Sequence, residues 1–165
     1  MIFMIPAIYF LRHCVCLLLF CCCIVMHASA ATPAMQVRTA SGEFDDVRDR
    51  VVMALENRGL VLSYTARVGD MLDRTGRDLG NDKPVYGKAE VLEFCSAAIS
   101  RETMMADPRN IVFCPYAIAV YTLPQMPRTV YLSYRAPATS GNAASIRALR
   151  KVEKLLADIV NEAMQ

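Results

Sequence analysis

Histidine and tryptophan are nearly missing from this sequence. The chain of 165 residues has no tryptophan and two histidines, His13 and His27. Both histidines precede residue 28, so the rest of the chain cannot contain a Ser-His-Asp or Cys-His catalytic site. Zinc, copper and haem sites that depend on histidine ligands are excluded there for the same reason.

Other common functional motifs are absent too. Neither G-x-x-x-x-G-K-[ST] nor G-x-G-x-x-G occurs, so the usual phosphate-binding loops are missing. The net charge is only +2, from 18 basic and 16 acidic residues. Nucleic-acid binding needs a strong basic excess, so we expect no nucleic-acid partner. The apolar fraction of 55% does support a packed core.

The N-terminus has the pattern of an export signal. Arg12 precedes an uncharged apolar run over residues 14–26, and the small residues Ala28-Ser29-Ala30 follow it. This pattern predicts a secretory signal peptide over residues 1–30, cleaved after Ala30, and a periplasmic or secreted protein. Because residues 2–10 are also apolar, an uncleaved membrane anchor is the alternative.

The hydrophobic periodicity after the signal predicts one α+β domain over residues 37–165, preceded by a short leader over 31–36. The predicted order is βαβαβαββα, in a two-layer α/β sandwich with a mixed sheet and helices on one face. A small three-layer α/β domain is the alternative. Strands are expected near 36–40, 60–66, 85–95, 110–122 and 129–135, and helices near 41–58, 68–79, 96–106 and 143–160. Pro115 inside a predicted strand implies a bulge or an edge position, because proline cannot donate to the ladder.

Removal of the signal would leave two cysteines, Cys95 and Cys114. In an oxidising compartment they could form a structural disulfide. They could also be two buried, inert thiols, or a functional pair with redox, sulfur-transfer or metal-binding chemistry. Cys95 lies at the start of a predicted helix, which favours a lowered thiol pKa.

Four residues near the cysteines are further candidates. Strand alternation places Glu93 on the side of Cys95 and Tyr116 on the side of Cys114, so Glu93 could accept a proton from a thiol. Met104 and Met105 follow in the next helix, and thioethers with thiolates suit Cu(I). The simpler interpretation is a solvated carboxylate and core methionines. Tyrosines also gather in the last predicted hairpin, where they either line a binding surface or pack.

Several short motifs resemble the bacterial domain-of-unknown-function family numbered 302. They are Phe44-Asp45-Asp46-Val47, Asn57-Arg58-Gly59-Leu60, Met71-Leu72, Pro84-Val85-Tyr86, Phe94-Cys95-Ser96 and Phe113-Cys114-Pro115-Tyr116. The resemblance covers residues 37–137 and implies a compact two-layer α/β sandwich that forms a homodimer. It also implies that Cys95 and Cys114 occupy the two places where the family typically has cysteine. It implies no reaction, because none is established for the family.

We therefore expect an exported, non-enzymatic binding or accessory domain without a cofactor. Its partner would be an envelope protein or a small molecule. The alternative is a thiol-based redox or sulfur-transfer protein that uses Cys95 and Cys114. A lesser alternative is a soft-metal or haem thiolate site.

Overall fold

The computed structural model describes residues 35–137 and 141–165. Contacts divide the chain into two units, Met1–Ala31 and Thr32–Gln165, and all described residues belong to the second. The predicted signal, its cleavage site after Ala30 and residues 31–34 of the leader lie outside the described residues. Within the described part, no helix is long and apolar enough to cross a membrane.

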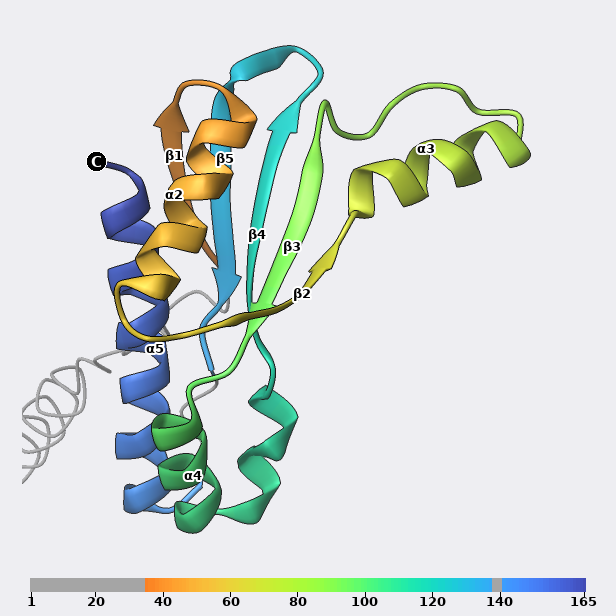
Figure 1. The fold of residues 1–165 in the computed structure, drawn as a ribbon. Helices are drawn as coiled ribbons and strands as arrows, with labels where there is room; N and C mark the ends of the chain where they lie inside the picture. The colour runs from red at the N-terminus through yellow and green to blue at the C-terminus, as the bar shows by residue number, and fades with distance from the viewer. Residues whose placement is uncertain (1–34, 138–140) are drawn as a thin grey trace, which may run out of the picture. The chain divides into compact units, whose positions relative to one another are not determined.

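The described elements follow the predicted order, with one added 3₁₀ helix (Figure 1). The strands are β1 (Met35–Ser41), β2 (Leu62–Ala66), β3 (Ala89–Phe94), β4 (Tyr116–Leu123) and β5 (Met126–Arg135). The helices are α2 (Phe44–Glu56), α3 (Val68–Asp78), α4 (Ala97–Ala106), η1 (Pro108–Phe113) and α5 (Ala143–Ala163). The α+β class is confirmed.

The strands form one open sheet in the order β1-β5-β4-β3-β2. Every pairing is antiparallel, so the sheet is not mixed as predicted. The reason is visible in Figure 1: α3 lies at one end of the sheet, and α4 with η1 lies at the other. The connections from β2 to β3, from β3 to β4 and from β4 to β5 each return the chain at the end where it left, so these neighbouring strands alternate in direction.

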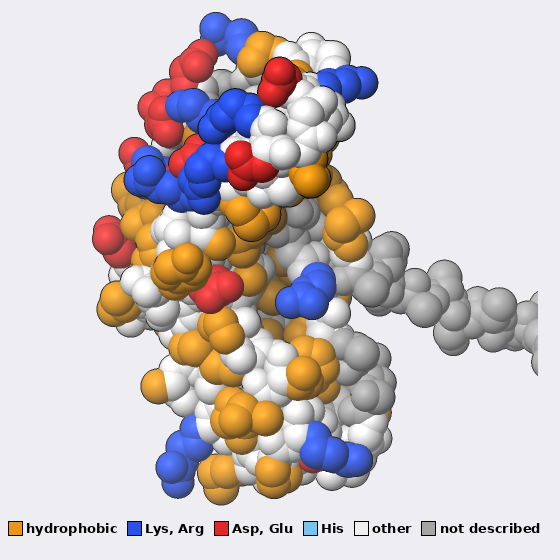
Figure 2. Space-filling view, turned by 90° about the vertical axis from the view of Figure 1, so that its right-hand side faces the viewer, with side chains coloured by type: hydrophobic (Ala, Val, Ile, Leu, Met, Phe, Trp, Pro, Cys, Tyr) orange, Lys and Arg blue, Asp and Glu red, His pale blue; other side chains and the backbone are white. Residues whose placement is uncertain are grey.

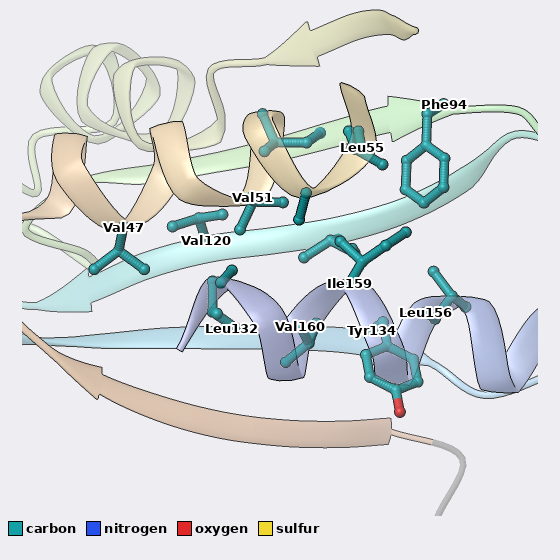
Figure 3. Packing of buried hydrophobic residues seen from close by; sticks show 14 of the residues in the cluster. Val47, Val51, Leu55, Phe94, Val120, Leu132, Tyr134, Leu156, Ile159 and Val160 are labelled. Atoms are coloured by element: carbon teal, nitrogen blue, oxygen red, sulfur yellow. The ribbon is translucent and has the colours of Figure 1, made fainter. Parts of the chain in front are cut away.

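The core lies between one face of the sheet and the helices α2 and α5. Alternate residues of β4 point into it, among them the fully buried Ile118 and Val120. Figure 3 shows Val120 and Leu132 of the sheet beside Val47 of α2 and Ile159 of α5. The apolar stripes of two helices thus cover a single sheet face, as the hydrophobic periodicity predicts.

The predicted strand over 110–122 is wrong in its first part. Residues 108–113 form η1 instead, because Pro108 suits the first position of a helical turn and Asp107 caps it. The Asp107 carboxylate accepts a hydrogen bond of 3.0 Å from the Arg109 backbone N–H. Pro115, in a cis peptide with Cys114, comes just before β4. It therefore needs no bulge or edge position, and β4 is a central strand.

Helix α3 forms where predicted, but it does not cover the sheet. None of its residues is buried, although Met71, Leu72 and Thr75 give it an apolar side. It extends from the end of β2, away from the helical layer (Figure 1). Side chains of both charges gather at that end of the molecule (Figure 2). The prediction of helices on one face thus applies to α2 and α5.

Val120→Ala should lower the free energy of unfolding by about 2 kcal/mol, because it removes two buried methyl groups and leaves a cavity. The matched control is Val61→Ala. Val61 is 76% exposed and Val120 is fully buried, so the control should change stability by less than about 0.5 kcal/mol. Urea unfolding of the full chain measures both values. Equal losses of unfolding free energy in the two variants would contradict this assignment of the core.

Candidate functional site

The pairing of β3 with β4 brings the two cysteines together. Phe94 pairs with Tyr116 at the end of the ladder, and Cys95 directly follows Phe94. Cys114 lies two residues before Tyr116, at the end of η1. The two Sγ atoms are 3.0 Å apart, and both cysteines are free thiols. Residues separated by α4 and η1 in the sequence therefore form one dithiol site.

The same geometry allows a disulfide. A disulfide has its sulfur atoms about 2.05 Å apart, so a side-chain movement of about 1 Å would close the bridge. In the loop-entropy model, a bridge around the connection from Cys95 to Cys114 would contribute on the order of 3 kcal/mol. Cys95 is exposed and Cys114 is half-buried, so solvent and solutes reach the pair.

A short polar chain leads from Cys114 into the interior. The Ser100 Oγ of α4 lies 3.6 Å from the Cys114 Sγ and 3.1 Å from the Tyr116 hydroxyl. Ser100 and Tyr116 are both buried. The sequence analysis identified Tyr116 but missed Ser100. The available signal was a small polar residue on the inward side of α4, one turn after Ser96.

The environment of Cys95 raises its thiol pKa to about 11. Partial burial of the sulfur is the main cause, followed by the hydrogen bond with Cys114 and the negative charge of Cys114. The predicted lowering is therefore wrong. Ser96 holds the N-cap of α4, where its side chain accepts a hydrogen bond from the Ile99 N–H, and Cys95 lies outside the helix.

The remaining candidates are Glu93 on β3 and two methionines on α4, the half-buried Met104 and the exposed Met105. Glu93 lies on β3, paired with Ala117, and its charge adds a small increase to the pKa of Cys95. Met105 is 74% exposed on α4. Among residues 35–137 and 141–165, no three His, Cys, Asp or Glu side chains are arranged to hold a metal ion. The soft-metal and haem alternatives stay predictions.

A pocket of about 270 Å³ lies beside Cys114 at the same end of the sheet. Phe113 and Pro115, the sequence neighbours of Cys114, form part of its wall together with Val152 of α5. Arg135 at the end of β5 also lines it. The pocket therefore combines apolar walls with a cationic group next to the dithiol.

The tyrosines of the β4–β5 hairpin divide between the two faces of the sheet. Tyr116 and Tyr134 are buried in the core. Tyr121 and Tyr131 point to the opposite face, where their rings stack with centroids 5.0 Å apart. Tyr86, from the loop before β3, meets Tyr121 edge-on at 5.4 Å. These three rings, Tyr86, Tyr121 and Tyr131, form the tyrosine cluster.

The tyrosine cluster lies on the face that α2 and α5 leave uncovered. We call this surface the open face. Strand register places small side chains at its centre: Ala117, Ala119 and Ser133. Glu93 on β3 pairs with Ala117, and extending the β4–β5 register two residues beyond the Ala119–Ser133 pair brings Arg135 of β5 into the same row. The open face thus has an aromatic end, a small-residue centre and an end with one charge of each sign.

The reduced full chain should react with iodoacetamide at Cys95 with a midpoint near pH 11, because only the thiolate is alkylated. Short pulses of iodoacetamide over a series of pH values, followed by mass spectrometry of the tryptic peptide 89–101, measure the rate of alkylation. Cys114→Ser should lower the midpoint, since it removes the negative charge beside Cys95. The urea-unfolded chain is the reference, with a midpoint near the ordinary value of 9.0. A folded-state midpoint at or below this value would contradict the raised pKa.

Comparison with known proteins identifies the family. A crystal structure of an uncharacterized conserved protein DUF302 from Bacillus stearothermophilus matches with a TM-score of 0.67 and 16% identity. The match covers 80% of this chain and 99% of the other, so the two share a fold. No curated protein matches the sequence. The family model described as domain of unknown function DUF302 matches residues 29–164. The chain therefore belongs to the DUF302 family, as its motifs predict.

Proposed function

We propose that this protein is an exported, non-enzymatic binding domain that uses its open face as the binding surface. The observation that carries the proposal is a five-stranded sheet with helices on one side and a tyrosine cluster on the other. Tyrosine provides contact area with little loss of side-chain entropy, so it is favoured at interfaces. The raised pKa of Cys95 also supports a non-enzymatic role, because a protonated thiol is a poor nucleophile.

The partner that best fits the open face is a second copy of this chain. Two facing sheets related by a two-fold axis parallel to β4 would place β3 of one copy over β5 of the other. Glu93 of each copy would then lie opposite Arg135 of the other copy. Within the described part of the chain, neither side chain has an ion-pair partner. The same axis places Tyr131 over the small Ala89 of the other copy.

Charge reversal tests this homodimer. Glu93→Arg or Arg135→Glu alone would place like charges opposite each other, and each should convert the dimer of the full chain to a monomer. The double variant exchanges the two charges and should restore the dimer. Light scattering coupled to size-exclusion chromatography measures the mass.

Arg147→Glu, on the exposed side of α5, is the control for a single charge reversal and should leave the dimer intact. A monomeric wild-type chain would reject the homodimer. Single variants that stay dimeric would show that copies associate through another surface.

Export is tested by the mass and location of the protein in the producing cell. We expect it in the periplasm, beginning at Ala31. Ala30→Asp should block cleavage, because signal peptidase sites need a small uncharged residue there. Ala34→Asp is the control and should be cleaved normally. Full-length wild-type protein in the cytoplasm would refute export, and full-length protein in the membrane would favour the anchor alternative.

The cysteine pair supports a second candidate function, thiol–disulfide exchange or sulfur transfer. The specific observation is the distance of 3.0 Å between two sulfur atoms at an accessible end of the sheet. Accessible bridges are reduced more readily than buried ones, and they are the type used in regulation and catalysis. In an oxidising compartment the bridged form would be the resting state.

A further inference from the structure

We propose that the bridged cysteine pair reacts in one direction: an incoming thiolate attacks Cys95, and Cys114 leaves with a hydrogen bond from Ser100. This inference deepens the second candidate function and rests on it. It assigns different roles to two cysteines that the sequence alone does not distinguish.

Accessibility selects the sulfur that is attacked. Thiol–disulfide exchange is an in-line displacement, so the nucleophile must approach one sulfur from the side opposite the other. Cys95 is exposed, and Cys114 is half-buried. Beside Cys114 lies the buried Ser100 of α4. An external thiol therefore reaches Cys95 more easily than Cys114.

The polar chain stabilises the sulfur that leaves. Ser100 Oγ is 3.6 Å from Cys114 Sγ and 3.1 Å from the hydroxyl of Tyr116. The Ser100 O–H can donate to the Cys114 thiolate while its oxygen accepts a hydrogen bond from the Tyr116 O–H. Hydrogen bonds to a charged group are stronger than neutral ones, so the interaction favours release of Cys114 as an anion. Ser100 contacts the reacting sulfur, and Tyr116 is a positioning residue that acts through Ser100.

The electrons balance over a complete cycle. A thiolate RS⁻ forms a bond to Cys95 Sγ, and the electron pair of the Cys95–Cys114 bond passes to Cys114 Sγ. The product is a mixed disulfide between RS and the sulfur of Cys95. A second RS⁻ then attacks the RS sulfur, which gives RSSR and releases Cys95 as a thiolate that takes a proton from water. Two thiols are oxidised and the bridge is reduced. A small disulfide, as oxidant, re-forms the bridge by the reverse exchanges.

The test uses the full chain, oxidised with glutathione disulfide and then exposed briefly to reduced glutathione. Acid quenching, alkylation and tryptic digestion separate the two cysteines, because cleavage after Arg101 and Arg109 gives the peptides 89–101 and 110–128. We expect glutathione on the first peptide and the alkyl group on the second. Glutathione mainly on peptide 110–128, or equally on both, would overturn the proposed direction.

The role of Ser100 is tested by the rate of that first exchange. Ser100→Ala should slow it on the order of tenfold, and Ser100→Thr should restore most of the rate. Ser96→Ala is the matched control: it removes the N-cap of the same helix and should lower the melting temperature without slowing exchange. Equal rates for wild type and Ser100→Ala would refute the role of Ser100. A bridge that forms but never exchanges with glutathione would refute the exchange function itself.

Discussion

The antiparallel pairing of β3 with β4 sets the positions of most groups that matter in this domain. Its last pair, Phe94 and Tyr116, lies at the point where the chain leaves the sheet for α4 and returns from η1. Cys95 and Cys114 flank that pair, so the ladder that stabilises the sheet also brings the sulfur atoms together. The edge-on contact of the two rings, with centroids 6.0 Å apart, packs this corner of the core.

An uneven distribution of helices follows from the same topology. The connection that contains α4 and η1 occupies one end of the sheet, and α3 extends beyond the other (Figure 1). Two helices, α2 and α5, remain to cover the broad surface of five strands, and both pack on one side. The other side keeps the alternating pattern of a half-buried sheet. A domain built this way leaves one broad face of its sheet without a helical cover.

The chemistry of the cysteine pair depends on which oxidation state is present. As a dithiol, Cys95 has a raised pKa and is a slow nucleophile at neutral pH. As a disulfide, the exposed Cys95 needs no ionisation, because the external thiol supplies the negative charge. The burial that raises the pKa of the reduced thiol therefore does not prevent the bridged form from reacting. An oxidising compartment would make the bridged form the more relevant one.

The sequence by itself determined the type and order of the elements, the family and the candidate role of both cysteines. Periodicity is a local property: the apolar stripe of α5 or the alternation in β4 follows from a few neighbouring residues. Local rules misjudged residues 108–113, where apolar β-type residues form η1 because Asp107 and Pro108 start a helical turn first. They also misjudged the pKa of Cys95, because partial burial of the sulfur and its contact with Cys114 raise this pKa, and Ser96 rather than Cys95 holds the helix N-terminus.

Only the tertiary structure decided which residues that are far apart in the sequence come into contact. It alone shows that the sheet is antiparallel and that α3 buries none of its residues. It also separates Tyr121 and Tyr131 on the open face from Tyr116 and Tyr134 in the core. The contact of Ser100 with Cys114 is likewise visible only in the tertiary structure. These features depend on which strands pair and in which register, and that choice is made by the packing of the whole domain rather than by any short segment.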